Sequence, residues 1–245
     1  MDVKGNPVKV AVVIPTHLRL NFLVQRALPS VKAQTRKPNL VVVVSDDYDL
    51  EHPYKTEAED VYRALPDAVY LTNNRTRQSS GTGARNTGIL HVRETLGPKC
   101  FIALLDDDDE WAPTHLQDCC EVAEQHSSVR WVAPGFFRLM DWPHNAGSHD
   151  TLQRTNSDTG PSHADSEPRL PLKENFQHIR MPLRVEEPTV ALLLKQCPGE
   201  VDFFNIGSNT FVRCDTLIGC GIYDEKCRVF NDRELSIRLV DYLNR

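Results

Sequence analysis

The sequence predicts an α/β fold with a mostly parallel central sheet and helices on both faces. Two observations lead to this prediction. Short apolar, β-branched runs alternate with segments of helical spacing over the first two-thirds of the chain, and two of the best runs end directly in aspartates. Strands that alternate with helices favour right-handed crossovers and parallel pairing. Ligands bind beyond the carboxyl ends of such strands, so we expect both aspartate clusters at one edge of the sheet.

The elements of the first half follow one another in a regular order. Apolar strands are expected at residues 8–14, 40–44, 68–71 and 101–105. Helical patterns lie between them, at residues 21–34, 55–64 and about 81–96. Pro15 should stop the first strand, and Pro29 should kink or break the first helix, because proline lacks an N–H group and clashes with the preceding turn.

The second half is less regular. A helix with Pro113 near its first turn is followed by a short strand at residues 129–133. Residues 143–171 are rich in Ser, His, Asp, Asn, Gly and Pro and nearly free of large apolar side chains, which is typical of a functional lid or a disordered segment. Beyond it, residues 209–213 indicate a strand and residues 233–243 a closing amphipathic helix.

Composition excludes several classes of protein. The net charge of −6 does not favour nucleic-acid binding. The seven cysteines are scattered without a Cys-x-x-Cys pair, so neither a disulfide framework nor a zinc site is expected. No apolar run reaches the roughly 18 residues of a membrane span, and the start of the chain lacks a signal-peptide pattern. We therefore expect a cytoplasmic protein without a transmembrane segment, with peripheral membrane association as the alternative.

An acidic run follows the strand at residues 101–105. It comprises Asp106, Asp107, Asp108, Asp109 and Glu110. An isolated run of this kind is usually a solvated surface loop. Here its first members emerge from the core, where like charges repel unless a cation neutralises them. Oxygen-only ligands select a hard cation such as Mg²⁺ or Mn²⁺, which one or two carboxylates hold together with substrate phosphates.

Several segments occur in an order that resembles a known family. They are Val12–Thr16 with Arg19, Val42–Asp47, Gly83–Ile89, Leu105–Trp111, Gly221–Glu225, and Asn231–Leu235 with Arg238. Together they resemble glycosyltransferase family 2 over about residues 8–135 and 203–240. The resemblance implies a GT-A fold and the inverting transfer of a sugar from a nucleotide-diphosphate sugar to an acceptor hydroxyl.

The resemblance also implies roles for individual residues. Asp232 is the expected catalytic general base. Asn231 stands where the family has glutamate, and Glu234 is the fallback; the simpler alternative for Asp232 is a carboxylate favoured by the start of a helix. The metal ligand is expected among Asp108 and Asp109. The residues expected to bind or adjoin the nucleotide sugar are Pro15, Thr16, Arg19, Asp46, Asp47, Arg85, Asp106 and Asp107.

Within that set, Asp46 or Asp47 should meet the base, or else simply form a turn. Asp106 is expected near the ribose, and Asp107 beside the ligands rather than among them. Arg85 either contacts the donor phosphates or forms a structural salt bridge.

One domain is expected over residues 1–245. Residues 1–135 should bind the nucleotide sugar, residues 143–190 should form a flexible insertion or lid, and residues 200–245 should supply the acceptor side and the catalytic base. The expected donor is a UDP-, GDP- or dTDP-sugar, and the acceptor is a glycan, a lipid-linked molecule or a small molecule. The acceptor site would draw on the insertion or on a second subunit, as in a homodimer.

Three alternatives carry similar residues. A phosphotransfer enzyme of haloacid-dehalogenase type also has aspartates after a strand, but it needs Thr or Val at the position that Glu110 occupies. A non-catalytic module that binds a nucleotide or a divalent metal would hydrolyse no nucleotide sugar. A nucleotidyltransferase would need a Gly-rich loop after the first strand, and residues 15–19 do not supply one.

Overall fold

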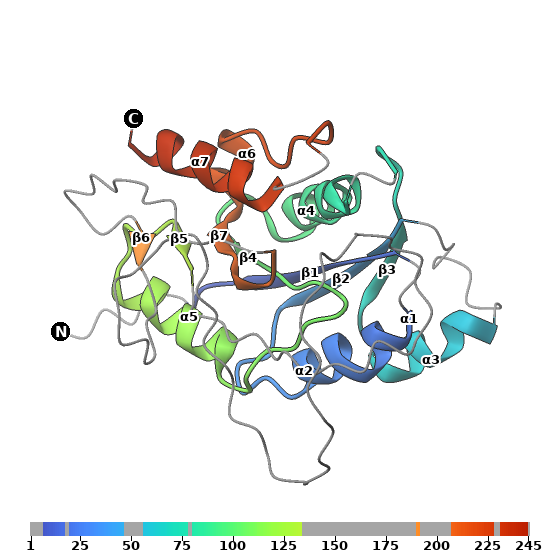
Figure 1. Ribbon diagram of the computed structural model, residues 1–245. Coiled ribbons are helices and arrows are strands. Elements are labelled where there is room, and N and C mark those ends of the chain that lie inside the picture. Colours follow the sequence, from blue (N-terminus) through green and yellow to red (C-terminus); the bar gives the residue numbers. More distant parts are fainter. Residues whose placement is uncertain are drawn as a thin grey trace, which may run out of the picture. The chain divides into compact units, whose positions relative to one another are not determined.

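The computed structural model describes residues 7–17, 20–46, 56–77, 80–133, 190–191, 207–227 and 231–244 (Figure 1). All of them belong to one compact unit, formed by residues 1–135 and 178–245, whereas a second unit comprises residues 136–177. Arg19, Asp47 and, apart from Val190, the expected insertion at residues 143–190 lie outside the described residues.

A seven-stranded sheet with the order β3-β2-β1-β4-β7-β5-β6 forms the centre of this unit. Its strands are β1 Val10–Thr16, β2 Leu40–Ser45, β3 Val69–Thr72, β4 Phe101–Leu104, β5 Trp131–Val132, β6 Val190–Ala191 and β7 Phe211–Arg213. The first four strands pair in parallel, and so do β5 and β6. Strand β7 runs antiparallel to both β4 and β5. The prediction of a mostly parallel sheet is confirmed.

Helices cover both faces of the sheet, as expected (Figure 1). They are α1 Leu20–Phe22, the π-helix η1 Leu23–Ala27, α2 Leu28–Lys32, α3 Thr56–Ala64, α4 Thr82–Leu96, α5 His115–Gln125, the 3-10 turn η2 Gly207–Asn209, α6 Cys214–Gly219 and α7 Asn231–Leu243. In Figure 1, α2, α3 and α5 lie below the sheet, and α4, α6 and α7 lie above it.

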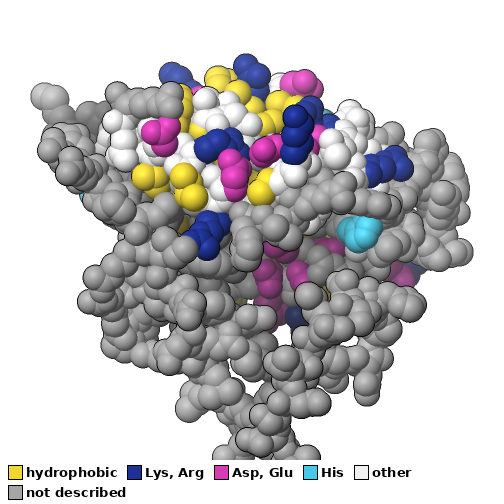
Figure 2. Space-filling view, turned by 45° about the horizontal axis from the view of Figure 1, so that its top comes forward, with side chains coloured by type: hydrophobic (Ala, Val, Ile, Leu, Met, Phe, Trp, Pro, Cys, Tyr) yellow, Lys and Arg dark blue, Asp and Glu magenta, His cyan; other side chains and the backbone are white. Residues whose placement is uncertain are grey.

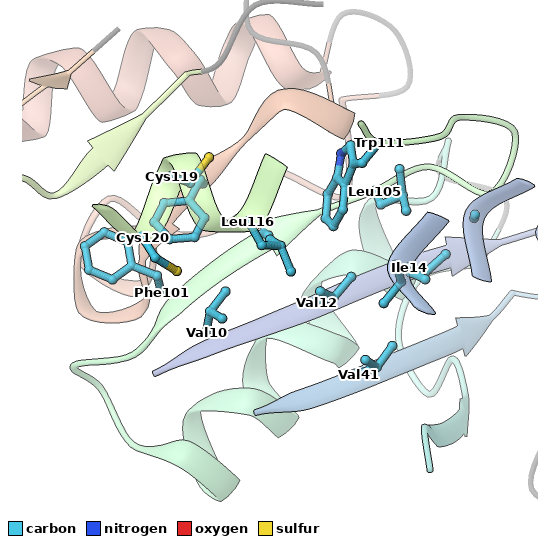
Figure 3. Packing of buried hydrophobic residues seen from close by; sticks show 14 of the residues in the cluster. Val10, Val12, Ile14, Val41, Phe101, Leu105, Trp111, Leu116, Cys119 and Cys120 are labelled. Carbon is cyan, nitrogen blue, oxygen red and sulfur yellow. The ribbon is translucent and has the colours of Figure 1, made fainter. Parts of the chain in front are cut away.

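The core is divided by the sheet into two apolar clusters. Side chains alternate along β1, so that Val10, Val12 and Ile14 belong to one cluster while Ala11 and Val13 belong to the other. Figure 3 shows how the first cluster joins β1, β2 and β4 to α5. A central strand buried on both faces explains why this run is apolar at nearly every position.

Strand β1 continues through Pro15 to Thr16, so the expectation that Pro15 stops it is wrong. The carbonyl of Val13 accepts from the N–H of Leu105 at 3.1 Å, which means that odd-numbered residues of β1 face β4. Strand β4 ends at Leu104. Pro15 therefore faces a position where the ladder has already ended, and its missing N–H costs no strand hydrogen bond.

The helical segment does not break at Pro29. Instead, the turn before it widens into the π-helix η1, and the N–H of Leu28 bonds to the carbonyl of Leu23, five residues back. Such π-turns are rare and often occur at functional sites. This one carries Arg26, whose guanidinium donates to the backbone carbonyl of Asp108 at 2.9 Å.

Candidate functional site

The carboxyl ends of the parallel strands bring both aspartate clusters to one edge of the sheet, as the sequence predicts. Asp46 follows β2, and its N–H donates to the carbonyl of Thr16 at 2.9 Å. The hydroxyl of Thr16 donates to a carboxylate oxygen of Asp107 at 2.8 Å. The last residue of β1 thus contacts both clusters. Figure 2 shows a group of acidic side chains near the middle of the view.

The aspartate turn after β4 is held by contacts from several elements. Asp107 is fully buried against Thr16, whereas Asp108 and Asp109 are partly exposed. The N–H of Asp109 donates to the carbonyl of Asp106 at 3.2 Å and closes the turn. Asp107 is thus engaged with the end of β1, whereas the two aspartates that follow it are accessible.

An antiparallel strand adds a second segment to this edge. Because β7 runs opposite to β4, the residues that precede it, rather than those that follow it, lie beside the aspartate turn. The hydroxyl of Ser208 accepts from the N–H of Asp106 at 2.9 Å and donates to the carboxylate of Asp109 at 2.5 Å. The carbonyl of Ser208 accepts from the indole N–H of Trp111 at 2.7 Å, which agrees with a packing role for this tryptophan.

Arg85 lies at the centre of the site and is 5% exposed. Its guanidinium donates to the carboxylate of Asp106 at 2.5 Å and to the carbonyl of Ser80 at 2.9 Å. Burial acts to lower the pKa of Arg85. The negative charges of Asp106 and its neighbours outweigh this effect, so the net shift of the pKa is upward. The structural salt bridge considered for Arg85 is therefore present. Gly207 fits beside the pair, since an added Cβ would lie 2.8 Å from Asp106.

Asp232 reaches the same cluster from the start of α7. One of its carboxylate oxygens accepts from the hydroxyl of Tyr223 at 3.0 Å. Partial burial raises the pKa of Asp232, and the charge of Asp106 adds to the rise. The guanidinium of Arg85 and the hydrogen bonds from Tyr223 and the N–H of Gly207 oppose it, but the net shift is upward. A carboxylate of raised pKa is suited to accept a proton.

Glu234, the fallback for the base, is engaged elsewhere. Its two carboxylate oxygens accept from the guanidinium of Arg238 at 2.5 and 2.6 Å. The same guanidinium donates to the carbonyl of Cys220 at 2.7 Å, so it ties α7 to the end of α6. This arrangement favours a structural role for Glu234.

The expected base-binding end contains Asp46, which is 1% exposed. Its carboxylate accepts from the side-chain amide of Asn73 at 2.5 Å. The amide oxygen of Asn73 in turn accepts from the hydroxyl of Thr87 on α4 at 2.9 Å. Asp46 is thereby fixed at the edge, close to Thr16.

Four site residues have no role in the sequence-based prediction: Arg26, Asn73, Ser208 and Tyr223. Tyr223 belongs to one of the motifs that resemble family 2, but the motif gave it no function. Ser208 precedes a predicted strand, and only the antiparallel direction of that strand brings it to the aspartates. Arg26 and Asn73 carried no signal beyond their residue types.

The aspartate turn fits a divalent cation only if the substrate and water supply most of the ligands. Within the described ranges, no group of three or more His, Cys, Asp or Glu side chains is arranged to hold a metal. Mg²⁺ and Mn²⁺, however, commonly use one or two carboxylates and complete their shell with phosphate oxygens and water. Asp108 and Asp109, two partly exposed residues of one turn, have carboxylates of the kind that this mode requires.

A comparison of the sequence with models of protein families identifies the family of this chain. The model of glycosyl transferase family 2 matches residues 11–215, which include β1 except Val10, β2, β4 and the aspartate turn. The chain belongs to glycosyl transferase family 2. The match ends before α7, so the model does not include Asp232.

Relatives and solved structures agree with this family. The succinoglycan biosynthesis protein ExoW of Rhizobium meliloti (strain 1021) is 37% identical over 108 residues, which cover 44% of this chain and 32% of ExoW. The chain thus corresponds to about a third of that relative. Residues 1–349 of S. aureus TarS in complex with UDP give a TM-score of 0.57 at 14% identity, covering 96% of this chain and 56% of that one.

The TarS complex with UDP-GlcNAc gives a TM-score of 0.55 at 13% identity, covering 96% of this chain and 54% of that one. These likenesses confirm the GT-A fold. The mannosyltransferase PcManGT from Pyrobaculum calidifontis, in complex with GDP-Man and Mn²⁺, is more distant: its TM-score is 0.40 at 21% identity, with 52% of this chain and 35% of that one covered. No helix in the described part of the chain is both long and apolar enough to cross a membrane.

Proposed function

We propose that this family 2 chain transfers a sugar from a nucleotide-diphosphate sugar to an acceptor hydroxyl with inversion, and that Asp232 is the general base. The observation that carries the proposal is the meeting of Asp232 and the Arg85–Asp106 ion pair. Asp232 comes from α7 and Asp106 from the turn after β4, yet both lie against Arg85 and Gly207. A proton acceptor beside the strand ends that bind donors is what a direct displacement needs.

The donor would lie along the edge formed by β1, β2 and β4. In this proposal Asp46 meets the nucleobase, and Asp106 lies near the ribose. Arg85 holds Asp106 in place rather than binding the phosphates alone. Pro15 and Thr16 form the floor at the end of β1. The same role for Arg19 and Asp47 stays a prediction, because both lie outside the described residues.

The chemistry divides between the two ends of the donor. The acceptor oxygen attacks the anomeric carbon from the face opposite the diphosphate, and the bond to the diphosphate breaks as the new bond forms. Asp232 takes the proton of the attacking hydroxyl, which contributes about 10²–10⁴-fold in rate. Mn²⁺ or Mg²⁺, held by Asp108 or Asp109, would neutralise charge on the leaving diphosphate. With that charge neutralised, the leaving group needs no proton.

The names of the similar proteins support a choice of substrates. TarS was solved with UDP and with UDP-GlcNAc, so a UDP-sugar is our first choice of donor. ExoW takes part in succinoglycan biosynthesis, which favours a glycan or a lipid-linked glycan as acceptor. The division into a donor part at residues 1–135, a lid at 143–190 and an acceptor part at 200–245 remains part of the proposal, as does a homodimer.

A panel of nucleotide sugars tests the proposal. The chain would be incubated with UDP-glucose, UDP-N-acetylglucosamine, GDP-mannose and dTDP-glucose, with Mn²⁺, Mg²⁺ or EDTA. Nucleotide release and the shift in melting temperature would both be measured, because a bound donor stabilises the folded state by mass action. We expect one donor to raise the melting temperature and to release nucleotide only with the divalent ion. Stabilisation without any nucleotide release would favour a non-catalytic binding module, and phosphate release without sugar transfer would favour a phosphotransfer enzyme.

A further inference from the structure

Tyr223 joins the two charged parts of the site. Its hydroxyl donates to the carboxylate of Asp232 at 3.0 Å, and its ring lies under the guanidinium of Arg85, 5.3 Å from the ring centroid to Cζ. The residue is 2% exposed. A cation over an aromatic face is attracted by the ring, so Arg85 holds the ring while the hydroxyl reaches past it to Asp232.

The backbone of Tyr223 is fixed as tightly as its ring. The side-chain amide of Asn86 donates to the carbonyl of Tyr223 at 2.9 Å, and the amide oxygen accepts from its N–H at 3.0 Å. Asn86 also donates to the carboxylate of Glu225 at 2.9 Å. Two consecutive residues of α4 therefore hold Tyr223: Arg85 contacts its ring, and Asn86 binds its backbone.

The segment is anchored at Glu225 as well. Its carboxylate pairs with Arg75 and accepts from the N–H of Thr76 at 3.2 Å. Partial burial acts to raise the pKa of Glu225, but hydrogen bonds from Asn86, Thr76 and Arg75 outweigh it and lower the pKa to about 2. Glu225 thus stays ionised and paired, and the loop between α6 and α7 has a fixed position at Tyr223.

We propose that Tyr223 is a positioning residue, whose hydroxyl holds the Asp232 carboxylate in the orientation that receives the acceptor proton and links it to the Arg85–Asp106 pair. The inference rests on the proposed function of Asp232 as the base. A hydrogen bond to a charged group contributes more than a neutral one, and its loss would let the carboxylate turn toward Arg85. Base catalysis depends on the reach and angle of that carboxylate.

The variant Tyr223→Phe isolates this contact. Phenylalanine keeps the buried ring and the face that Arg85 covers, and it removes only the hydroxyl. We expect kcat to fall about 10- to 100-fold, with the donor KM changed less than threefold. The groups that face Asp232 are Arg85, Asp106, Tyr223 and the N–H of Gly207. The hydrogen bond from Tyr223 favours the ionised carboxylate of Asp232 and so lowers its pKa. Loss of this bond should raise that pKa and move the acid limb of the pH profile of kcat to higher pH.

A purely structural tyrosine would behave differently, and Tyr70→Phe provides the comparison. The hydroxyl of Tyr70 donates to the carbonyls of Val61 and Leu65 at 3.0 and 2.7 Å, away from the aspartates. Both variants lose a partly buried hydroxyl, so both should lose some thermal stability. Only Tyr223→Phe should change kcat and its pH profile. If the two variants share the same kcat and the same acid limb, the inference is wrong.

The test separates this inference from the proposed function. Turnover of UDP-N-acetylglucosamine with Mn²⁺ would be followed for the wild-type chain and both variants, and the carboxyl carbon of Asp232 would be titrated by NMR, with Asp232→Asn to assign its signal. Active wild type with an unaltered Tyr223→Phe profile overturns only the inference. If no donor of the panel binds or turns over, the proposed function fails. The NMR titration still decides the contact in that case: a higher pKa of Asp232 in Tyr223→Phe supports it, and an equal pKa overturns it.

Discussion

The two sides of the site are built by different means. On the side of the parallel strands, Asp46 follows β2 directly and Asp106 comes two residues after the end of β4, and the strand register sets where they lie. On the C-terminal side, Tyr223 and Asp232 reach the edge through side-chain hydrogen bonds, while Ser208 lies between the two groups because the β4–β7 ladder places it there. Backbone ladders determine the first group, and single side chains determine the second.

This difference has a consequence for substitutions. A backbone ladder tolerates the loss of one side chain, because neighbouring strands still hold the register. A segment held by side chains loses its position when one partner is removed. We therefore expect substitutions on the C-terminal side to affect catalysis more than donor binding.

The largest effect is expected for Asp232→Asn, which keeps the shape of the side chain but removes the proposed proton acceptor. We expect kcat to fall about 10²- to 10⁴-fold. The melting-temperature shift caused by UDP and Mn²⁺ should be retained, since the donor edge is unchanged. Steady-state kinetics and thermal-shift measurements on the same samples check both parts.

Glu234→Gln is the matched control, because it changes a carboxylate two residues further along α7. Glu234 pairs with Arg238, and we expect this variant to lower kcat less than tenfold. A larger loss in Glu234→Gln than in Asp232→Asn would move the base to Glu234 and reverse the assignment.

A large effect on stability is expected for Asn86→Ala. This change removes the bonds to both backbone groups of Tyr223 and leaves them buried without that partner. The free energy of unfolding should fall by about 2–4 kcal/mol. Asn74→Ala is the control, since Asn74 is exposed and accepts from the hydroxyl of Thr87 at 3.2 Å. Its loss should lower the free energy of unfolding by no more than about 0.5 kcal/mol. Urea unfolding of both variants decides whether the clamp on Tyr223 matters.

The sequence predicts one side of the site better than the other for a physical reason. The strand ends of residues 40–44 and 101–105 carry their aspartates in sequence, and parallel pairing places them at one edge without further information. The antiparallel direction of β7 left no mark in its short apolar run, so the place of Ser208 was not predictable. The contact between Tyr223 and Asp232 depends on the path of the chain between α6 and α7, which no local pattern encodes.

A smaller effect is expected for Ser208→Ala, which removes the hydroxyl that bridges Asp106 and Asp109. The aspartate turn should become less well ordered, and the Mn²⁺ concentration needed for half-maximal UDP binding should rise by up to about tenfold. Ser30→Ala, which removes a buried hydroxyl bonded to the carbonyl of Ala27, serves as the control. Equal Mn²⁺ dependence in both variants would show that Ser208 does not order the proposed metal-binding turn.

The smallest effect at neutral pH concerns His115, which supports Ser208 through Trp111. Its ring stacks on the indole of Trp111 with centroids 4.4 Å apart, and that indole donates to the carbonyl of Ser208. Burial lowers the pKa of His115 to about 4, although Asp118 opposes the shift. Between this value and the ordinary value of about 6.5, the unfolded chain binds a proton that the folded chain does not, so stability should fall as the pH drops through that window.

His115→Phe keeps a ring against Trp111 but cannot bind this proton. The free energy of unfolding should therefore decline less steeply between pH 6.5 and 4 than in the wild type, while above pH 6.5 the two curves should run parallel. Urea unfolding at a series of pH values measures both slopes. Identical slopes below pH 6.5 would mean that His115 is protonated as readily in the folded chain as in the unfolded one. The packing of His115 against Trp111 would then be looser than the stacked rings indicate.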